Sequence, residues 1–346
     1  MQINDRLGNK YIIQKPLTSG GMGEVWLAKD IELERIVAIK TAFRNLSASS
    51  FKDEAKNGAK LLGHPNIVSL LDYGYETVRD ESIQYIVMEY VEGITLNEFV
   101  HYIKEKVDFQ TYYHISLLIT WELCKSVEYA HKKDIIHRDI KPSNIFLSIN
   151  GFLKLGDFGL SKIANEETRN HTVKGCRTYA YAAPEQWKGG THSKQTDIYQ
   201  LGGTLYHLFT GRKPFEEFNN TYSLLNAHLE KPVDSPLTLE ELPNQLSDII
   251  VKMLSKDANN RPDIWEVTDI VSKELQGSYE FTVFVNSEDK ELIEKVHRIT
   301  DFEFTEDNLS TGSSTALFVD FTEVLSEGIQ LLVSGIHEFK IEKNIT

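Results

Sequence analysis

Apolar and polar side chains alternate along the first part of the chain, which is the pattern of half-buried β-strands. The alternation predicts strands over residues 11–17, 24–29, 36–42, 67–71 and 83–89. One stretch, near residues 50–63, has the spacing of a helix instead. Successive side chains of a strand point to opposite faces, so each of these strands would bury one apolar face. This part of the chain is therefore expected to form a small sheet with one helix.

The middle of the chain is predicted to be mostly helical. A buried central helix is indicated by apolar side chains at helical spacing, namely Ile115, Leu118, Ile119, Leu123, Val127 and Ala130. Further helices are expected over residues 193–211, 221–229, 244–255 and 263–275. The dipeptide Asn150-Gly151 separates two short apolar runs and predicts a β-hairpin.

The last part, residues 277–346, has a different pattern. Alternation predicts strands over residues 279–286, 302–305, 316–321 and 338–342. Helical spacing is found over residues 290–299 and 323–336. The resulting order βαββαβ is typical of a small ferredoxin-like α/β module. A disordered acidic tail is the alternative, although the aromatic residues and the regular alternation argue against it.

The composition is that of an ordinary globular protein, with 41% hydrophobic and 25% charged residues. The two cysteines, Cys124 and Cys176, cannot build a disulfide framework, which favours a reducing compartment. A membrane span is not expected, because no apolar run approaches roughly 18 residues. The N-terminus also lacks the basic and apolar layout of a signal peptide. The sequence therefore predicts a cytoplasmic protein.

Negative charge is concentrated towards the C-terminal end. The formal net charge is −14, and residues 277–346 hold 14 acidic and 5 basic residues. An acidic balance argues against nucleic acid or an anionic membrane as the main partner. The acidic stretch serves solubility, or alternatively it marks a module that forms a homodimer or binds a regulatory partner.

Two short segments bring together the residue types that phosphoryl transfer uses. They are His137-Arg138-Asp139-Ile140-Lys141-Pro142-Ser143-Asn144 and Asp157-Phe158-Gly159. Asp139 can accept the hydrogen bond of an attacking hydroxyl, and Lys141 can reach the moving phosphoryl group. Asn144 and Asp157 offer side-chain oxygens to Mg²⁺, a hard cation that prefers such ligands. This combination, at this spacing, indicates the chemistry of a protein kinase.

Further residues for the same chemistry lie upstream. Val37-Ala38-Ile39-Lys40 alternates as a strand, so Ala38 can face an adenine ring while Lys40 reaches the α- and β-phosphates. Glu54, in the helix near residues 50–63, is the expected partner of Lys40. Taken singly, Lys40 and Glu54 would be interpreted as surface residues, so their assignment depends on the combination.

The motifs together resemble those of a known family. Ala183-Pro184-Glu185 follows the segment that begins at Asp157, and Asp197 and Arg261 lie beyond it. With these residues, the chain resembles the eukaryotic-type (Hanks-type) Ser/Thr protein kinases, especially their bacterial members.

The resemblance covers residues 11–275 and implies an α+β, bilobal protein kinase fold. A small, β-rich N-lobe would span residues 11–90 and a larger, helical C-lobe residues 91–275. Residues 1–10 would then be an N-terminal lead, and residues 277–346 an accessory domain.

The resemblance also implies ATP as the nucleotide, with Mg²⁺ as its metal and Mn²⁺ as the alternative. The loop that covers the nucleotide would comprise Leu17, Thr18, Ser19, Gly20, Gly21, Met22 and Gly23. Thr18 stands where the family has its first glycine. Glycine lets a backbone approach phosphates closely, so Thr18 predicts a stiffer loop and weaker nucleotide affinity.

An adenine slot is expected between the lobes. Met88 holds the gatekeeper position before the hinge Glu89-Tyr90-Val91, whose backbone would bind the adenine edge. Val25, Ala38 and Phe146 would cover the two faces of the ring.

The segment between Asp157 and Ala183 carries the regulatory predictions. In the family, the hydroxyl at the position of Thr178 bridges the catalytic Asp and Lys, whereas Arg177 replaces a glycine. Arg138 is typical of kinases whose activation segment is ordered by phosphorylation, because Arg binds phosphate bidentately. The predicted autophosphorylation sites are Thr172 and Thr168.

Three residues are expected to act structurally. Asp197 would anchor the backbone of the catalytic loop, and Arg261 would form a buried ion pair with Glu185. The predicted function is ATP-dependent phosphorylation of Ser or Thr in proteins, the chain itself included. The alternative is a pseudokinase scaffold or nucleotide-binding switch, which the departures at Thr18 and Arg177 would favour.

Overall fold

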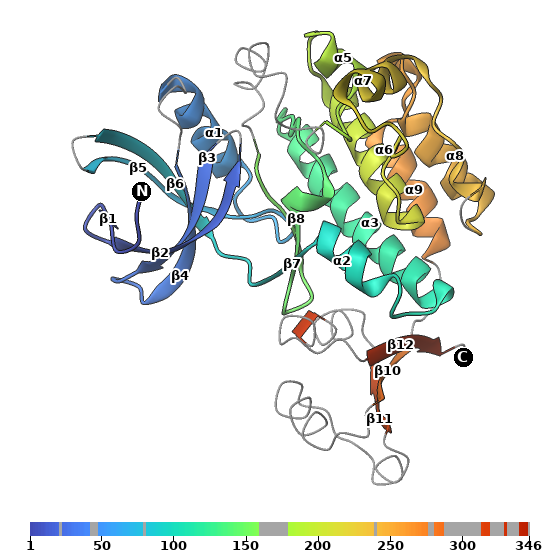
Figure 1. Ribbon diagram of the computed structural model, residues 1–346, viewed down its shortest axis with the longest axis horizontal. Helices are drawn as coiled ribbons and strands as arrows, with labels where there is room; N and C mark the ends of the chain where they lie inside the picture. The colour runs from blue at the N-terminus through green and yellow to red at the C-terminus, as the bar shows by residue number, and fades with distance from the viewer. Residues whose placement is uncertain are drawn as a thin grey trace.

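The structure is a computed structural model. It describes residues 1–20, 23–41, 48–78, 81–158, 179–238, 241–275, 280–286, 313–318, 329–330 and 339–344. Figure 1 shows a β-rich lobe on the left, a helical lobe on the right and a separate three-stranded sheet below them.

The small lobe is built on an antiparallel sheet in the order β1-β2-β3-β4-β6-β5. Its strands are β1 (Arg6–Leu7), β2 (Tyr11–Gly20), β3 (Gly23–Asp30), β4 (Arg35–Thr41), β5 (Leu70–Val78) and β6 (Glu81–Glu89). The helix α1 (Ala48–Lys60) packs on this sheet through Phe51 and Ala55, which contact Ile86 of β6. The predicted sheet with one helix is confirmed.

Two details of this lobe differ from the sequence prediction. The strand predicted over residues 67–71 begins later, at Leu70, and continues to Val78. Ile67 instead forms an isolated parallel bridge with Leu155 of the large lobe. Residues 1–10 are also more than a lead, because β1 pairs with β2 and Leu7 is fully buried in the core of the sheet.

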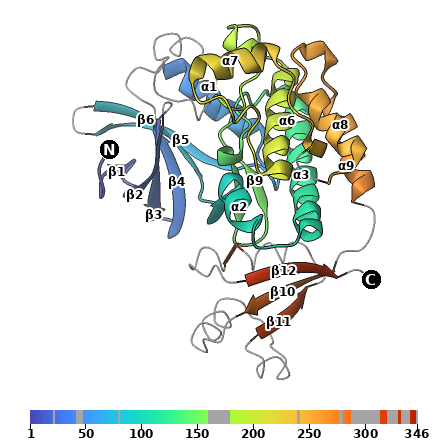
Figure 2. The same cartoon turned by 45° about the vertical axis from the view of Figure 1, so that its right-hand side comes forward.

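The large lobe consists mainly of helices. They are α2 (Leu96–Ile103), α3 (Phe109–Lys132), α5 (Pro184–Trp187), α6 (Lys194–Thr210), α7 (Thr221–Glu230), α8 (Asn244–Met253) and α9 (Ile264–Glu274). The central helix predicted around residues 115–130 is α3, and the four helices predicted after residue 193 are α6 to α9. In Figure 2, α6 and α3 run side by side through the lobe, and almost every residue of α6 is buried. Among the described helices, none has the length and apolar character that crossing a membrane requires.

A small sheet follows the hinge and packs on the core of the large lobe. Its strands are β7 (Gly93–Thr95), β8 (Ile145–Ser148) and β9 (Leu153–Leu155), in the order β7-β8-β9. The predicted hairpin at Asn150-Gly151 connects β8 to β9, and Gly151 has the positive φ of 75° that glycine tolerates. The short 3₁₀ helix Pro142–Asn144 precedes β8.

The C-terminal part forms an antiparallel sheet in the order β11-β10-β12. Its strands are β10 (Glu280–Asn286), β11 (Ser313–Phe318) and β12 (Phe339–Asn344). The first and last match the strands predicted over 279–286 and 338–342, whereas β11 begins three residues before the strand predicted over 316–321. The strand predicted over residues 302–305 and the helix predicted over 290–299 lie outside the described residues. Of the helix predicted over 323–336, the described part is Ile329 and Gln330, both helical.

This C-terminal part is in contact with the large lobe. Figures 1 and 2 both show its sheet beneath the end of the lobe that carries α2 and α3. Ile329 is 1% exposed and belongs to the core of the large lobe. Gln330 donates a hydrogen bond from Nε2 to the backbone oxygen of Ile149, which lies between β8 and β9, at 3.3 Å.

Candidate active site

The loop that follows α3 is fixed by a buried carboxylate. Asp197, in the first turn of α6, accepts backbone hydrogen bonds from His137 at 2.8 Å and from Arg138 at 2.7 Å. The ring Nε2 of His131 lies 2.8 Å from the same carboxylate. The predicted contact between Asp197 and the loop backbone is therefore present. It holds Arg138 at a φ of 70°, which is uncommon for a residue other than glycine.

Three polar side chains converge at the end of this loop. Asp139 Oδ2 accepts hydrogen bonds from Lys141 Nζ at 2.7 Å and from Asn144 Nδ2 at 2.9 Å. Asn144 Nδ2 also donates to the backbone oxygen of Asp139 at 2.8 Å. The 3₁₀ turn places Asn144 back over the loop, so the three residues form one cluster.

A second cluster joins three separate elements. Lys40 of β4 lies between two carboxylates, with its Nζ 2.7 Å from Asp157 Oδ1 and 3.3 Å from Glu54 Oε1 of α1. Asp157 follows β9 and has a φ of 61°. Phe158 then packs against the ring of His137, with ring centres 4.4 Å apart. The predicted partner of Lys40 is thus in contact with it, together with Asp157.

The pKa values of the two carboxylates in this cluster are shifted in opposite directions. Burial alone would lower the pKa of Lys40, but the attraction of Asp157 and Glu54 outweighs burial and raises it. For Asp157 burial would raise the pKa, but the Lys40 ammonium outweighs burial and holds the pKa below its usual value. For Glu54 burial prevails and raises the pKa to about 7.

The geometry explains why the two carboxylates differ. Lys40 makes its shorter contact with Asp157, so Glu54 receives the weaker stabilisation. Glu54 is 6% exposed, and its Oε2 finds no hydrogen-bond partner in the described part of the chain. A buried carboxylate with one oxygen unsatisfied favours the protonated form.

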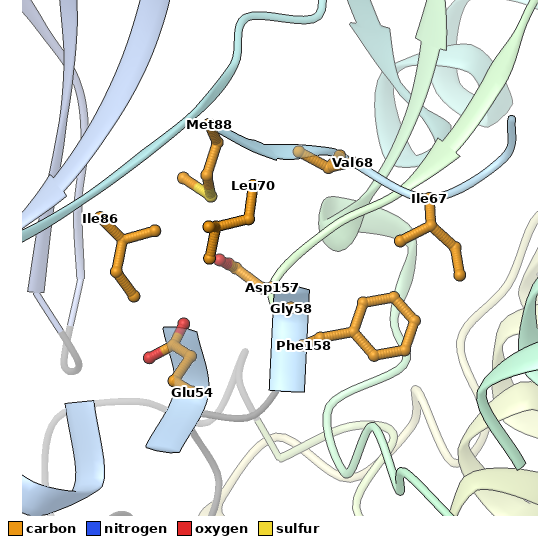
Figure 3. Close-up of a pocket in the computed structure, with 9 residues that line it drawn as sticks. All are labelled: Glu54, Gly58, Ile67, Val68, Leu70, Ile86, Met88, Asp157 and Phe158. Atoms are coloured by element: carbon orange, nitrogen blue, oxygen red, sulfur yellow. The ribbon is translucent and has the colours of Figure 1, made fainter. Parts of the chain in front are cut away.

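A pocket of about 370 Å³, part of it open to solvent, lies beside these residues. Its lining comprises Glu54, Gly58, Ile67, Val68, Leu70, Ile86, Met88, Asp157 and Phe158. In Figure 3, Met88 lies above Leu70, and Asp157 and Glu54 lie below them. The predicted gatekeeper is therefore next to the Lys40 cluster. Gly58 in this lining was not predicted from the sequence.

The residues predicted to hold a nucleotide lie along the adjoining strands. Thr18, Val25 and Lys40 occupy one row across β2, β3 and β4, and Ala38 pairs with Met88 of β6. Leu17 and Phe146 are half-buried, and Thr18 is exposed. Ser19, Gly20 and Gly23 belong to the paired ends of β2 and β3. Gly21 and Met22 lie outside the described residues.

The hinge is connected to both lobes through Glu89. Its Oε1 accepts hydrogen bonds from the backbone of Ser69 at 2.7 Å and from Lys154 Nζ at 2.8 Å. The side chain of Glu89 is therefore engaged in holding the hinge.

The predicted ion pair at the end of the activation segment is present. Arg261 binds Glu185 bidentately, with Nη1 2.7 Å from Oε1 and Nη2 2.8 Å from Oε2. The Arg261 side chain is fully buried. Burial would raise the pKa of Glu185, but Arg261 outweighs burial and lowers it.

The other predictions for the activation segment cannot be placed in the same way. Thr168, Thr172 and Thr178 lie outside the described residues. Arg138 is half-buried, and its Nε has no hydrogen-bond partner within the described ranges. Burial lowers its pKa, against the attraction of Asp197.

Two glutamines next to the loop were missed by the sequence analysis. Gln186 Nε2 and Gln200 Nε2 both donate to the backbone oxygen of Arg138, at 3.0 Å and 2.7 Å. A signal for Gln200 was present, because it follows Asp197 by three positions and so lies on the same helix face.

Comparison with known proteins agrees with this geometry. The family model described as "Protein kinase domain" matches residues 11–273. The chain is 34% identical over 317 residues to the serine/threonine-protein kinase PrkC of Bacillus subtilis, covering 88% of this chain and 46% of that protein. It is 34% identical over 271 residues to the serine/threonine-protein kinase PknB of Mycolicibacterium smegmatis, covering 75% of this chain and 42% of that protein. The chain thus matches less than half the length of these two curated relatives.

A solved structure shares the fold. The crystal structure of the PknI kinase domain of Mycobacterium tuberculosis superimposes with a TM-score of 0.58 at 22% sequence identity. The match covers 79% of this chain and 99% of that one.

Proposed function

This chain belongs to the protein kinase family, and from that membership we propose that it transfers the γ-phosphate of ATP to Ser or Thr hydroxyls of proteins. The observation that carries the proposal is the pairing of two clusters in one site. Lys40 is bound to Asp157 at 2.7 Å, and Asp139 is bound to Lys141 and Asn144 within 2.9 Å. All the charged groups expected for phosphoryl transfer are present.

In this proposal Asp139 acts as the base that orients the attacking hydroxyl. Its carboxylate is held by Lys141 and Asn144, and its side chain is 19% exposed, so a hydroxyl can reach it. Lys141 is positioned beside the same oxygen and balances negative charge as the phosphoryl group approaches. Lys40 would bind the α- and β-phosphates, since its ammonium is fixed between two carboxylates.

The oxygen donors fit a hard divalent cation. Asn144 uses its amide nitrogen for Asp139, which leaves its amide oxygen available, and Asp157 is 34% exposed. In the described part of the chain no group of three or more acidic, histidine or cysteine side chains is arranged so that it could hold a metal ion. Mg²⁺ that arrives with a nucleotide needs only one or two protein oxygens. When bound there, Mg²⁺ or Mn²⁺ would offset charge on the phosphate oxygens.

A regulatory role for the activation segment belongs to the same proposal. The Arg138 guanidinium has an unpaired Nε among the described residues, and a phosphate offers the acceptor oxygens that Arg binds. We propose autophosphorylation at Thr172 or Thr168, with Thr178 contacting Asp139 and Lys141. Phosphopeptide mapping of the active chain tests this, and a map with neither Thr172 nor Thr168 modified would contradict it.

The domain boundaries are also proposals. Residues 11–275 would be the catalytic domain and residues 277–346 a ferredoxin-like accessory domain. The support is that the first strand, β10, lies between β11 and β12 in an antiparallel sheet, which the order βαββαβ can produce. The accessory domain would form a homodimer or bind a regulatory partner, and the mass of the chain in solution tests the first option. A cytoplasmic location is testable by cell fractionation.

The activity is tested with radiolabelled ATP, Mg²⁺ and a generic protein substrate. We expect incorporation into Ser or Thr, loss of incorporation when the cation is chelated, and recovery with added Mg²⁺ or Mn²⁺. The pseudokinase alternative, supported by Thr18 and Arg177, predicts nucleotide binding without incorporation. A chain that binds ATP and Mg²⁺ but transfers no phosphate would therefore exclude the proposed activity.

A further inference from the structure

Gln200 of α6 is a buried amide whose polar atoms are all directed at the candidate active site. Its side chain is 3% exposed. The Nε2 donates to the backbone oxygen of Arg138 at 2.7 Å, and the Oε1 accepts from the backbone N–H of Ile140 at 3.0 Å. Arg138 and Ile140 are the two neighbours of Asp139 in the chain.

These two contacts bind both peptide groups that flank Asp139. The Arg138 carbonyl belongs to the peptide bond before Asp139, and the Ile140 N–H belongs to the peptide bond after it. Fixing the two peptide planes fixes the backbone φ and ψ of Asp139, since those are the two soft dihedrals of a residue. The direction in which its carboxylate leaves the backbone is then set as well.

The orientation of the amide is determined by its surroundings. The Nε2 of Gln200 also donates to Gln186 Oε1 at 2.8 Å. In the opposite orientation the amide oxygen would face two oxygens, and the amide nitrogen would face the Ile140 N–H. Only one orientation of the amide satisfies every group, so these hydrogen bonds hold the amide in that orientation.

We infer that Gln200 is a positioning residue for catalysis, which holds the backbone on both sides of Asp139 and so places the candidate base. The inference rests on the proposed kinase activity. Asp197 binds the N–H groups of His137 and Arg138, before the base. Gln200 extends this support across the base itself.

The Gln200 side chain is also connected, through Gln186, to the end of the activation segment. Gln186 accepts from the backbone N–H of Ala183 at 2.9 Å and donates to the Arg138 oxygen at 3.0 Å. Gln200 and Gln186 therefore share one carbonyl and one hydrogen bond between them. Displacement of Ala183 would be transmitted to the peptide bond before Asp139 through this pair.

The side chain at this position needs a donor and an acceptor at a fixed distance from the helix. Met has nearly the same length and volume but can make none of the three hydrogen bonds. Asn keeps the amide on a stem shorter by one methylene. The variants Gln200→Met and Gln200→Asn thus separate loss of hydrogen bonding from loss of volume.

Steady-state kinetics of the full chain test the inference. For Gln200→Met we expect kcat to fall about tenfold, equivalent to about 1.4 kcal/mol, with the KM for ATP changed by less than about twofold. Gln200→Asn should lose less. The matched control is Thr204→Val, on the same helix and equally buried, whose hydroxyl lies 3.4 Å from the Ile140 oxygen. That distance is too long for a strong O–H···O bond, so this control should keep its kcat.

A second measurement does not depend on activity. Hydrogen exchange at the Ile140 amide should accelerate in Gln200→Met and stay unchanged in Thr204→Val. If the intact chain transfers no phosphate, the proposed function fails, while this exchange still shows whether Gln200 holds the loop. If the intact chain is active and Gln200→Met keeps its kcat within twofold, or if exchange at Ile140 does not change, the inference is wrong.

Discussion

Lys40 shows how a single cation can stabilise two carboxylates to different degrees. Its Nζ lies 2.7 Å from Asp157 Oδ1 and 3.3 Å from Glu54 Oε1. The pKa of Asp157 is lowered from its ordinary value, and the pKa of Glu54 is raised. Asp157 is thereby kept ionised, which its proposed role as a metal ligand requires. The pKa of Glu54 is left near neutral pH.

The raised pKa of Glu54 predicts a pH-dependent stability. Its pKa is about 7 when folded and 4.5 ordinarily, so the stability that it contributes is full below 4.5 and is lost as the pH rises through 7. Glu54→Gln stays neutral at every pH. Relative to the native chain, its free energy of unfolding should rise by on the order of 3 kcal/mol across this range.

Urea denaturation of the native chain and Glu54→Gln at several pH values measures this difference. Carboxylates that do not interact with Glu54 contribute equally to the two proteins and cancel. If the two stability curves stay parallel from pH 4.5 to about 7.5, Glu54 has an ordinary pKa and the prediction is wrong.

Asp139→Asn tests the assigned base. Asn has nearly the same shape as Asp, and its amide oxygen can still accept a hydrogen bond from Lys141. It lacks the carboxylate that would act as the base, so kcat should fall roughly 10²- to 10⁴-fold. ATP affinity should be unchanged, since Asp139 is not expected to touch the nucleotide. The matched control is Asp134→Asn, because the Asp134 side chain is 91% exposed and its one ion pair in the described chain, with Lys194, is exposed. Retained transfer by Asp139→Asn would exclude Asp139 as the base.

The polar residues of the site that belong to motifs could be predicted from the sequence, because their spacing within short motifs is fixed. Lys40, Asp139, Asn144 and Asp157 all lie where the motifs put them. For Gln200 the sequence indicates only a shared helix face with Asp197, because its partner Arg138 is 62 positions away in the chain. A buried amide has no periodic signature, and its role becomes visible only when α6 is placed beside the loop.

At the scale of elements, α6 supports the whole site. One face of this helix carries Asp197 and Gln200, and its residues from Thr196 to Thr210 are buried. Ser193 caps its first turn and Gly211, with a φ of 74°, ends it, so its length is fixed by local sequence. A helix that is capped at both ends is a suitable support for a loop with unusual backbone angles.

The segment that leads into α6 is held by the ion pair between Arg261 and Glu185. Arg261→Met should lower the free energy of unfolding by roughly 3–5 kcal/mol, because it leaves the Glu185 carboxylate without its partner. Lys252→Met is the control, since Lys252 and Glu266 form an exposed pair worth at most about 1 kcal/mol. Chemical denaturation compares the two, and equal losses would contradict the prediction.

Secondary structure was predictable where the pattern was long. The strands β2, β3, β4 and β6 and the helices α3 and α6 to α9 all follow clear periodicity. Short elements escaped, because β1 and β7 have two and three residues and cannot show an alternation. The helix α2 was missed too, although Thr95 and Glu98 form a capping box at its start.

At the scale of the whole molecule, the C-terminal part and the large lobe share a core. Ile329 is buried among the residues of the large lobe. Removing its side chain beyond Cβ, by Ile329→Ala, should therefore destabilise the full chain by roughly 2–5 kcal/mol. Thermal denaturation of the full chain measures the effect.

A chain ending at Leu275 provides the second comparison. It lacks Ile329 altogether, so Ile329→Ala and the truncated chain should both melt below the native chain. The control is Leu33→Ala, because Leu33 is 60% exposed on the small lobe and should change stability little. Unchanged melting of Ile329→Ala would mean that the contact contributes nothing in solution.

One residue, Ile149, is bound from two sides. Its N–H donates to the Glu92 carbonyl just past the hinge at 2.8 Å, and its own carbonyl accepts from Gln330. A residue clamped in this way passes on a displacement instead of absorbing it. We therefore expect displacement of the C-terminal segment to alter the position of the chain just past the hinge, and such a coupling would be reciprocal. Exchange of the Ile149 amide, measured with and without a nucleotide, tests this expectation.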